Sequence, residues 1–172
     1  SMFYNDNELV ALLPATLHGA ELRSHGGLTY GGIIVGRKMT VQVMLSVFDV
    51  LKEYVRKSNI LRLIYKRVPT IYYTYPSDED LYALFRNGAK LVRRDVASTI
   101  YLPDRISFSE RRRRGVKKSI KNGVVVQESN NYEEYISILS EILSKYHNAT
   151  PVHTADEIKL LANRFPENIK LY

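Results

Sequence analysis

The sequence predicts a mixed α/β domain in which helices pack on a sheet. Residues 2–13 have the pattern of a hairpin, with Asn5-Asp6-Asn7 at the turn, because short amide and carboxylate side chains tolerate a positive φ. Residues 41–57 follow Thr40, a good capping residue, and carry apolar side chains at helical spacing. Residues 60–66 then have the composition of a strand. A strand within the preceding glycine-rich stretch would complete a strand, helix, strand unit.

Composition limits the classes of protein. The 172 residues are 45% hydrophobic and 25% charged, which is typical of a globular chain. No apolar run approaches the roughly 18 to 20 residues that span a bilayer, and no basic and apolar leader is present. The absence of cysteine excludes disulfides and thiolate chemistry, which favours a cytoplasmic location. The four histidines lie far apart, so no metal site is expected.

The remaining elements are predicted from caps and periodicity. We expect a short strand at 20–23 and a long strand at 90–102 that Pro103 ends. Between them, Ser77-Asp78-Glu79-Asp80 is expected to open a short helix, with its acids at the favourable end of the helix dipole, and Asn87-Gly88 to close it. Further helices are expected at 110–122 after Ser109, at 131–146, and after a Thr154/Glu157 capping box. Strands are expected at 124–128 and 169–172. The last strand has no partner after it, which suggests a chain cut from a longer protein.

The stretch from Ser24 to Lys38 holds five of the nine glycines and is the candidate functional region. Its glycine pairs permit a positive φ and close approach by a ligand. We take His25 and Tyr30 as candidate catalytic residues, and Ser24, Gly31 and Gly32 as candidate substrate-binding residues. The alternative is a tight turn and a bulge with an ordinary structural histidine.

The element order from Met2 to Leu102 resembles the GNAT acyltransferase fold, with a central, mostly antiparallel sheet flanked by helices. The motif Ser-His-x-x-x-Thr-Tyr-Gly-Gly at 24–32 is similar to the first repeat of FemAB-like tandem GNAT proteins. The segment 81–89 resembles a GNAT helix that ends at a glycine, and 113–126 is similar to the segment that opens a second repeat. The resemblance implies a degenerate first repeat at 1–104 and the start of a second at 105–172.

The resemblance implies transfer of an acyl or aminoacyl group, from acyl-CoA or aminoacyl-tRNA, to an amine. The acceptor would be an amine-bearing small molecule or a cell-wall precursor, and no cofactor would be tightly bound. The GNAT pyrophosphate loop is missing, because Gly36-Arg37-Lys38-Met39-Thr40 stands in its place. Arg37 and Lys38 remain candidates for cofactor phosphates, or are two solvated charges. The chain is therefore expected to lack a complete donor site.

Seven basic residues between Arg111 and Lys121 account for much of the net charge of +7. On the expected helix, Arg112, Arg113, Lys117 and Lys121 are candidate contacts for nucleic acid, tRNA included, or for an anionic surface. A solvated basic face is the alternative. The Tyr72-Tyr73-Tyr75 group either stacks on a base or packs within the domain. A third hypothesis is a non-catalytic GNAT-like domain used for assembly.

Overall fold

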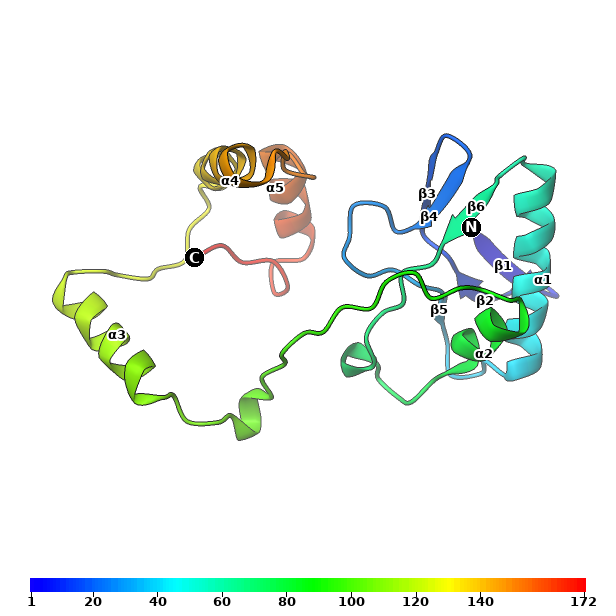
Figure 1. The fold of residues 1–172 in the computed structure, drawn as a ribbon, viewed down its shortest axis with the longest axis horizontal. Coiled ribbons are helices and arrows are strands. Elements are labelled where there is room, and N and C mark those ends of the chain that lie inside the picture. The colour runs from blue at the N-terminus through cyan, green and yellow to red at the C-terminus, as the bar shows by residue number, and fades with distance from the viewer. The chain divides into compact units, whose positions relative to one another are not determined.

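The computed structural model describes all residues from 1 to 172 and has an α+β fold (Figure 1). The chain divides into two compact units, Ser1–Asp95 and Val96–Tyr172. All six strands and the helices α1 and α2 belong to the first unit, and helices α3, α4 and α5 belong to the second. No helix combines the length and the apolar character needed to cross a membrane.

Two three-stranded sheets form the first unit. One sheet has the order β1-β2-β5, all antiparallel, and contains β1 (Met2–Asn5), β2 (Glu8–Leu12) and β5 (Ile34–Val35). The other has the order β3-β4-β6 and contains β3 (Ala15–His18), β4 (Glu21–Ser24) and β6 (Arg62–Ile64). The predicted hairpin at 2–13 is confirmed, and Asp6 and Asn7 at its turn have φ values of 45° and 71°.

The predicted strand, helix, strand unit is present in a different form. Strand β5 pairs with β2, whereas β6 pairs in parallel with β4, so β5 and β6 belong to different sheets. The parallel pair is therefore β4–β6, and the connection between them contains β5 and α1. The expected single central sheet is wrong in this respect. The short length of β5 explains the difference, because two residues of an apolar run do not determine which sheet they join.

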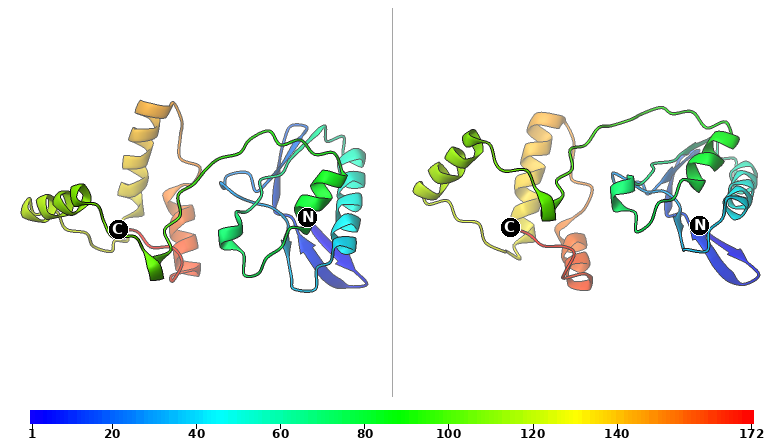
Figure 2. Two further views of the ribbon diagram at one scale, coloured as in Figure 1. Left: turned by 60° about the horizontal axis from the view of Figure 1, so that its bottom comes forward. Right: turned by 90° about the horizontal axis from the view of Figure 1, so that it is seen from below.

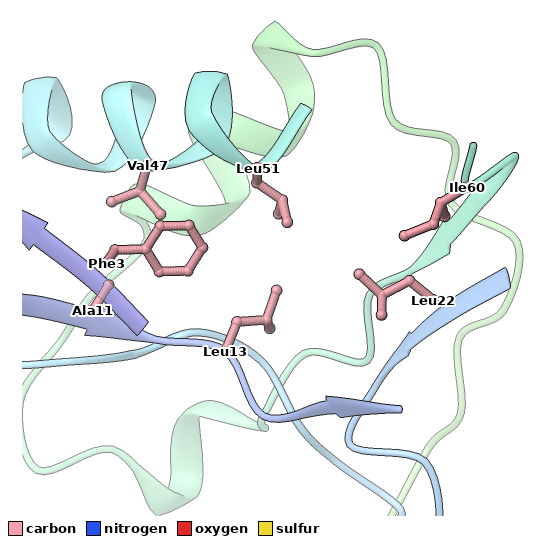
Figure 3. Packing of buried hydrophobic residues seen from close by; sticks show 7 residues of the cluster. All are labelled: Phe3, Ala11, Leu13, Leu22, Val47, Leu51 and Ile60. Atoms are coloured by element: carbon pink, nitrogen blue, oxygen red, sulfur yellow. The ribbon is translucent and has the colours of Figure 1, made fainter. Parts of the chain in front are cut away.

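Helix α1 (Val41–Lys57) covers both sheets and builds the core of the first unit. It begins and ends where the sequence predicts, and the Thr40 side chain accepts a hydrogen bond from the Val43 amide. Val47 and Leu51 on its inner face pack with Phe3 and Leu22, one from each sheet, and with Leu13, which lies between β2 and β3 (Figure 3). Leu13 is fully buried. Fully burying a side chain of this type contributes about 1.5–3 kcal/mol.

Helix α2 (Glu79–Arg86) lies beside α1, and its Ala83 packs against Met44 and Phe48. It ends at Asn87, and the following Gly88 has a φ of 66°, as predicted for a left-handed cap. A one-turn 3-10 helix at Thr70–Tyr72 precedes it. These elements place the start of α2 near the end of β6, where Asp80 meets Tyr65.

The second unit contains three helices. Helix α3 (Glu110–Lys121) is capped by Ser109 and has no buried residue. Helices α4 (Tyr132–His147) and α5 (Ala155–Arg164) lie side by side (Figure 2). The Thr154/Glu157 capping box of α5 is confirmed. A one-turn 3-10 helix lies at Leu102–Asp104.

Three predicted strands are wrong. Residues 90–102 and 124–128 form no strand and are exposed, and 169–172 contributes a single antiparallel bridge between Leu171 and Ser129. Each segment has suitable side chains, but a strand also needs a hydrogen-bonding partner. None of these segments finds a neighbouring strand of sufficient length.

Candidate functional site

The glycine-rich loop from His25 to Gly32 lies at the carboxyl ends of the parallel strands β4 and β6. Strand β4 ends at Ser24, where the loop begins, and β6 ends at Ile64, next to Tyr65 and Lys66. In sheets with parallel strands, ligands bind outside the carboxyl ends of the strands. This edge of the sheet is therefore the candidate functional site, and the candidate residues of the loop lie along it.

Lys66 holds the loop at three points. The Lys66 amide donates to the Ser24 hydroxyl over 2.7 Å, and the Lys66 carbonyl accepts from the Gly31 amide over 2.7 Å. The Lys66 ammonium group donates to the carbonyl of Leu28. Ser24 is fully buried, so its hydroxyl is engaged within the fold. The beginning, middle and end of the loop are thus attached to one residue.

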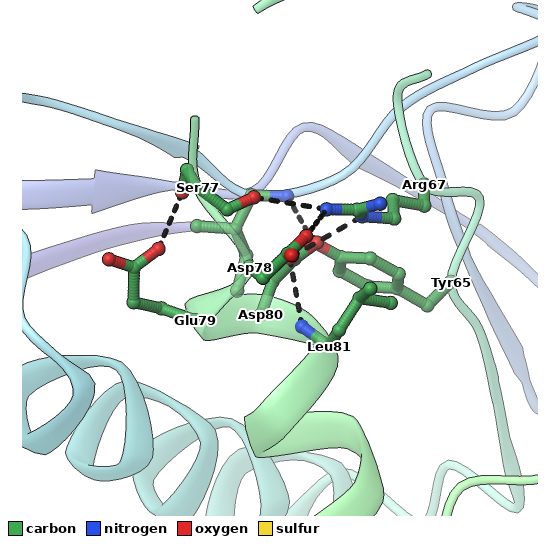
Figure 4. Close-up of polar contacts among 8 residues, drawn as sticks. Tyr65, Arg67, Ser77, Asp78, Glu79, Asp80 and Leu81 are labelled. Carbon is green, nitrogen blue, oxygen red and sulfur yellow. Dashed lines mark hydrogen bonds and ion pairs between the residues drawn. The ribbon is translucent and has the colours of Figure 1, made fainter. Parts of the chain in front are cut away.

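The Tyr65 hydroxyl contacts the chain at the end of the loop and the start of α2. It accepts a hydrogen bond from the Ile33 amide and donates one to a carboxylate oxygen of Asp80, both over 2.9 Å (Figure 4). A side chain at Gly32 would place its Cβ 2.7 Å from the same hydroxyl. A larger residue at this position would therefore displace the Tyr65 side chain. Burial, and then the negative charge of Asp80, raise the pKa of Tyr65 far above its usual range, so the phenol stays protonated.

Arg67 extends the polar network toward the start of α2 (Figure 4). It donates to the Ser77 carbonyl over 3.0 Å, pairs with Asp78 over 2.5 Å, and lies over the Tyr73 ring. Its Nε is 3.5 Å from Asp80, close enough for an ion pair but without a hydrogen bond. Partial burial lowers the pKa of Arg67, but the carboxylate of Asp80 and its other neighbours raise it by more.

His25 and Tyr30 are the half-buried side chains of the loop. His25 has a φ of 48°, and its amide donates to the Pro14 carbonyl over 2.8 Å. A Cβ at Gly31 would lie 2.1 Å from the His25 Cβ, so the small size of Gly31 makes room for His25. The Tyr30 ring packs on Tyr72, with 5.8 Å between their centroids. The fold thus brings four of the five catalytic and substrate candidates, those between His25 and Gly32, into one loop, in which Gly31 and Gly32 are buried.

Arg37 and Lys38 lie elsewhere, in the exposed turn between β5 and α1. Lys38 pairs with Glu8 of β2 over 2.8 Å, and this hydrogen bond and the carboxylate charge raise the pKa of Lys38. Arg112, Arg113, Lys117 and Lys121 belong to the second unit, where all four are exposed on α3. Arg113 pairs with Glu110 over 3.1 Å.

Sequence reasoning missed the roles of Lys66, Arg67 and Asp80. Lys66 appeared only as the end of an expected strand, and Asp80 only as a favourable charge at a helix start. The contact of Ser24 with Lys66 joins residues that are 42 positions apart, so no local pattern reveals it. The available signal for Asp80 is the acidic run Ser77-Asp78-Glu79-Asp80 after a tyrosine-rich stretch. Only some of its carboxylates are needed to complement the helix dipole, so another can form contacts elsewhere.

Comparisons with protein-family models, with curated proteins and with solved structures find no match to this chain.

Proposed function

We propose that this chain is part of an N-acyltransferase of the GNAT, FemAB-like type, and that the first unit supplies the wall that binds the acceptor amine. One observation supports this proposal most strongly. A glycine-rich loop with a histidine and a tyrosine is held rigidly at the carboxyl ends of a parallel strand pair, and the connection between these strands contains a long helix. That is where a sheet of this kind presents a ligand.

The chemistry assigned to the loop is acceptor activation. In the proposed reaction the amine nitrogen attacks a thioester or ester carbonyl, the N–C bond forms and the C–S or C–O bond breaks. His25 takes the proton that the amine loses, and the leaving thiolate or alkoxide finally receives it. The Gly31 and Ile33 amides already donate within the fold, so they do not serve as oxyanion donors. Ser24, Gly31 and Gly32 shape the loop, and Tyr30 lines the acceptor side.

The residues of this chain are proposed to form only part of the site that binds the acyl donor. The turn before α1 lacks the small residues of a pyrophosphate loop, and Lys38 there is paired with Glu8. Acyl-CoA or aminoacyl-tRNA would then be held by other residues of the intact enzyme.

NMR titration of the isotope-labelled chain tests both parts of the proposal. L-Lysine, glucosamine and spermidine serve as amine probes, and at least one is expected to shift the resonances of residues 25–30. His25→Asn should weaken that binding, and asparagine suits the left-handed backbone there. His147→Asn, at an exposed position on α4, is the matched control. Loop resonances that respond to none of the amines would refute the acceptor site, and tight binding of acetyl-CoA would refute the missing donor site.

A further inference from the structure

The second unit presents a basic helix that the proposed acyl transfer does not use. Helix α3 has no buried residue, although helices in folded domains ordinarily bury one face. Its only acidic residue, Glu110, pairs with Arg113. The other six basic side chains form no ion pair with a carboxylate, so this helix carries a large, uncompensated positive charge.

The charge is concentrated on one side of α3. At 3.6 residues per turn, six of the seven basic residues fall within an arc of roughly 160°. They are Arg111, Arg113, Arg114, Lys117, Lys118 and Lys121. Residues four positions apart in such a row are about 6 Å apart along the axis. This arrangement favours a partner with a row of regularly spaced phosphates over a single anion.

Aromatic side chains lie in the segment that leads into this helix. Phe108 is 57% exposed and Tyr101 is 69% exposed. The Arg105 guanidinium lies over the Phe108 ring, 5.9 Å from its centroid. A shallow depression of about 280 Å³ is lined by Arg105, Ile106, Ser107, Phe108 and Arg113. An exposed ring under one guanidinium group, in a depression that a second arginine also lines, offers stacking to a base and charge to its phosphate.

We infer that residues 101–121 form a binding surface for single-stranded nucleic acid, in which the α3 cations contact the phosphates and Phe108 stacks on a base. Binding of single strands without sequence preference combines these same two features, a basic track and exposed aromatic rings. A membrane fits less well, because an interfacial helix buries a wide apolar face. Here only Val116 and Ile120 are apolar, and they are 51% and 67% exposed.

Fluorescence anisotropy with a labelled 20-nucleotide polyuridylate tests the inference, with a 20-base-pair duplex and phosphatidylserine–phosphatidylcholine vesicles as competing ligands. The chain should bind the single strand in preference to both. Arg114→Gln/Lys118→Gln/Lys121→Gln should weaken this binding and reduce the slope of log K against log salt by about 2, at about 0.7 per phosphate contact. Lys145→Gln/Lys159→Gln/Arg164→Gln removes the same charge from exposed positions on α4 and α5, and should have a much smaller effect.

Phe108→Leu separates base stacking from simple charge attraction. It should weaken single-strand binding about five-fold or more and leave duplex binding unchanged, because only unpaired bases can stack on the ring. Equal losses in the two triple variants would overturn the role of α3. Preference for vesicles or for duplex, or a Phe108→Leu variant that binds like the parent, would overturn the assignment to single strands.

Discussion

Tyr65 donates its phenolic hydrogen to Asp80 over 2.9 Å, and the same oxygen accepts the amide hydrogen of Ile33. This one hydroxyl therefore joins three parts of the first unit: the end of β6, the start of α2, and the chain directly after the glycine-rich loop. Asp80 is 7% exposed and Tyr65 is half-buried. The pair forms part of the interior on which the candidate acceptor loop rests.

Removing the Tyr65 hydroxyl should destabilise the first unit. Tyr65→Phe leaves the Ile33 amide and one Asp80 oxygen without their partner, and an unsatisfied buried polar group costs about 1–3 kcal/mol. The free energy of unfolding, measured in urea by circular dichroism, should fall by that amount. Tyr54→Phe is the control, since Tyr54 is exposed on α1. If the two variants have the same stability, Tyr65 and Asp80 do not form the contact described.

Stability should decrease above about pH 10, the ordinary pKa of tyrosine. Folding raises the pKa of Tyr65, so its contribution is fully present below pH 10, where the phenol is protonated in both states. At higher pH the unfolded chain loses this proton and the folded chain keeps it, which favours unfolding by about 1.4 kcal/mol per pH unit. Urea unfolding between pH 9 and 11 should show a steeper decline for the parent chain than for Tyr65→Phe. Parallel curves would contradict the raised pKa.

Alanine should destabilise the protein at Gly32 and have little effect at Gly36. A Cβ at Gly32 would lie 2.7 Å from the Tyr65 hydroxyl and 3.0 Å from the ring carbon that carries it, whereas a Cβ at Gly36 meets no atom within 4 Å. Overpacking of a well-packed interior costs about 1–3 kcal/mol. We expect a loss of this size for Gly32→Ala in thermal unfolding, and a change of less than about 1 kcal/mol for Gly36→Ala. Similar melting temperatures for both variants would refute the close approach at Gly32.

Limited trypsin digestion should cut first between residues 93 and 121. Arg93, Arg94 and Arg105 are exposed and lie in chain that has no helix or strand, and the α3 cations follow. Proteases prefer such segments to packed elements. Mass spectrometry should find a resistant fragment that begins at Ser1 and ends near Arg94, because the core around Leu13 lies wholly within it. Early cleavage at Arg56 or Lys57 of α1 would contradict this description of the first unit.

The helices could be predicted from the sequence because their signals are local. The Thr40 cap, the Thr154/Glu157 capping box and Gly88 each lie within a few residues of the helix end that they define. Strand pairing depends on distant residues. The parallel pairing of Leu22 with Leu63 and the unpaired state of 90–102 both depend on what the rest of the chain offers, and neither follows from alternation.

In the candidate site, too, the local features could be predicted and those that depend on distant residues could not. The glycine-rich loop could be identified because its composition is unusual over a short stretch. Its supports could not, since Lys66 meets the loop only after β6 has paired with β4, and Asp80 meets Tyr65 only after α2 has packed on α1.

The three attachments to Lys66 determine how the loop can take part in binding. Because the start, middle and end of the loop are fixed by one residue, its conformational entropy is lost during folding and not when a ligand arrives. A ligand at this edge therefore meets a preorganised surface and needs less interaction energy to order it. Such a surface discriminates between ligands by shape and accommodates new ones poorly. Replacing the Lys66 side chain would keep its two main-chain hydrogen bonds and remove the one to Leu28, so it would free the middle of the loop even if Lys66 itself never touched the ligand.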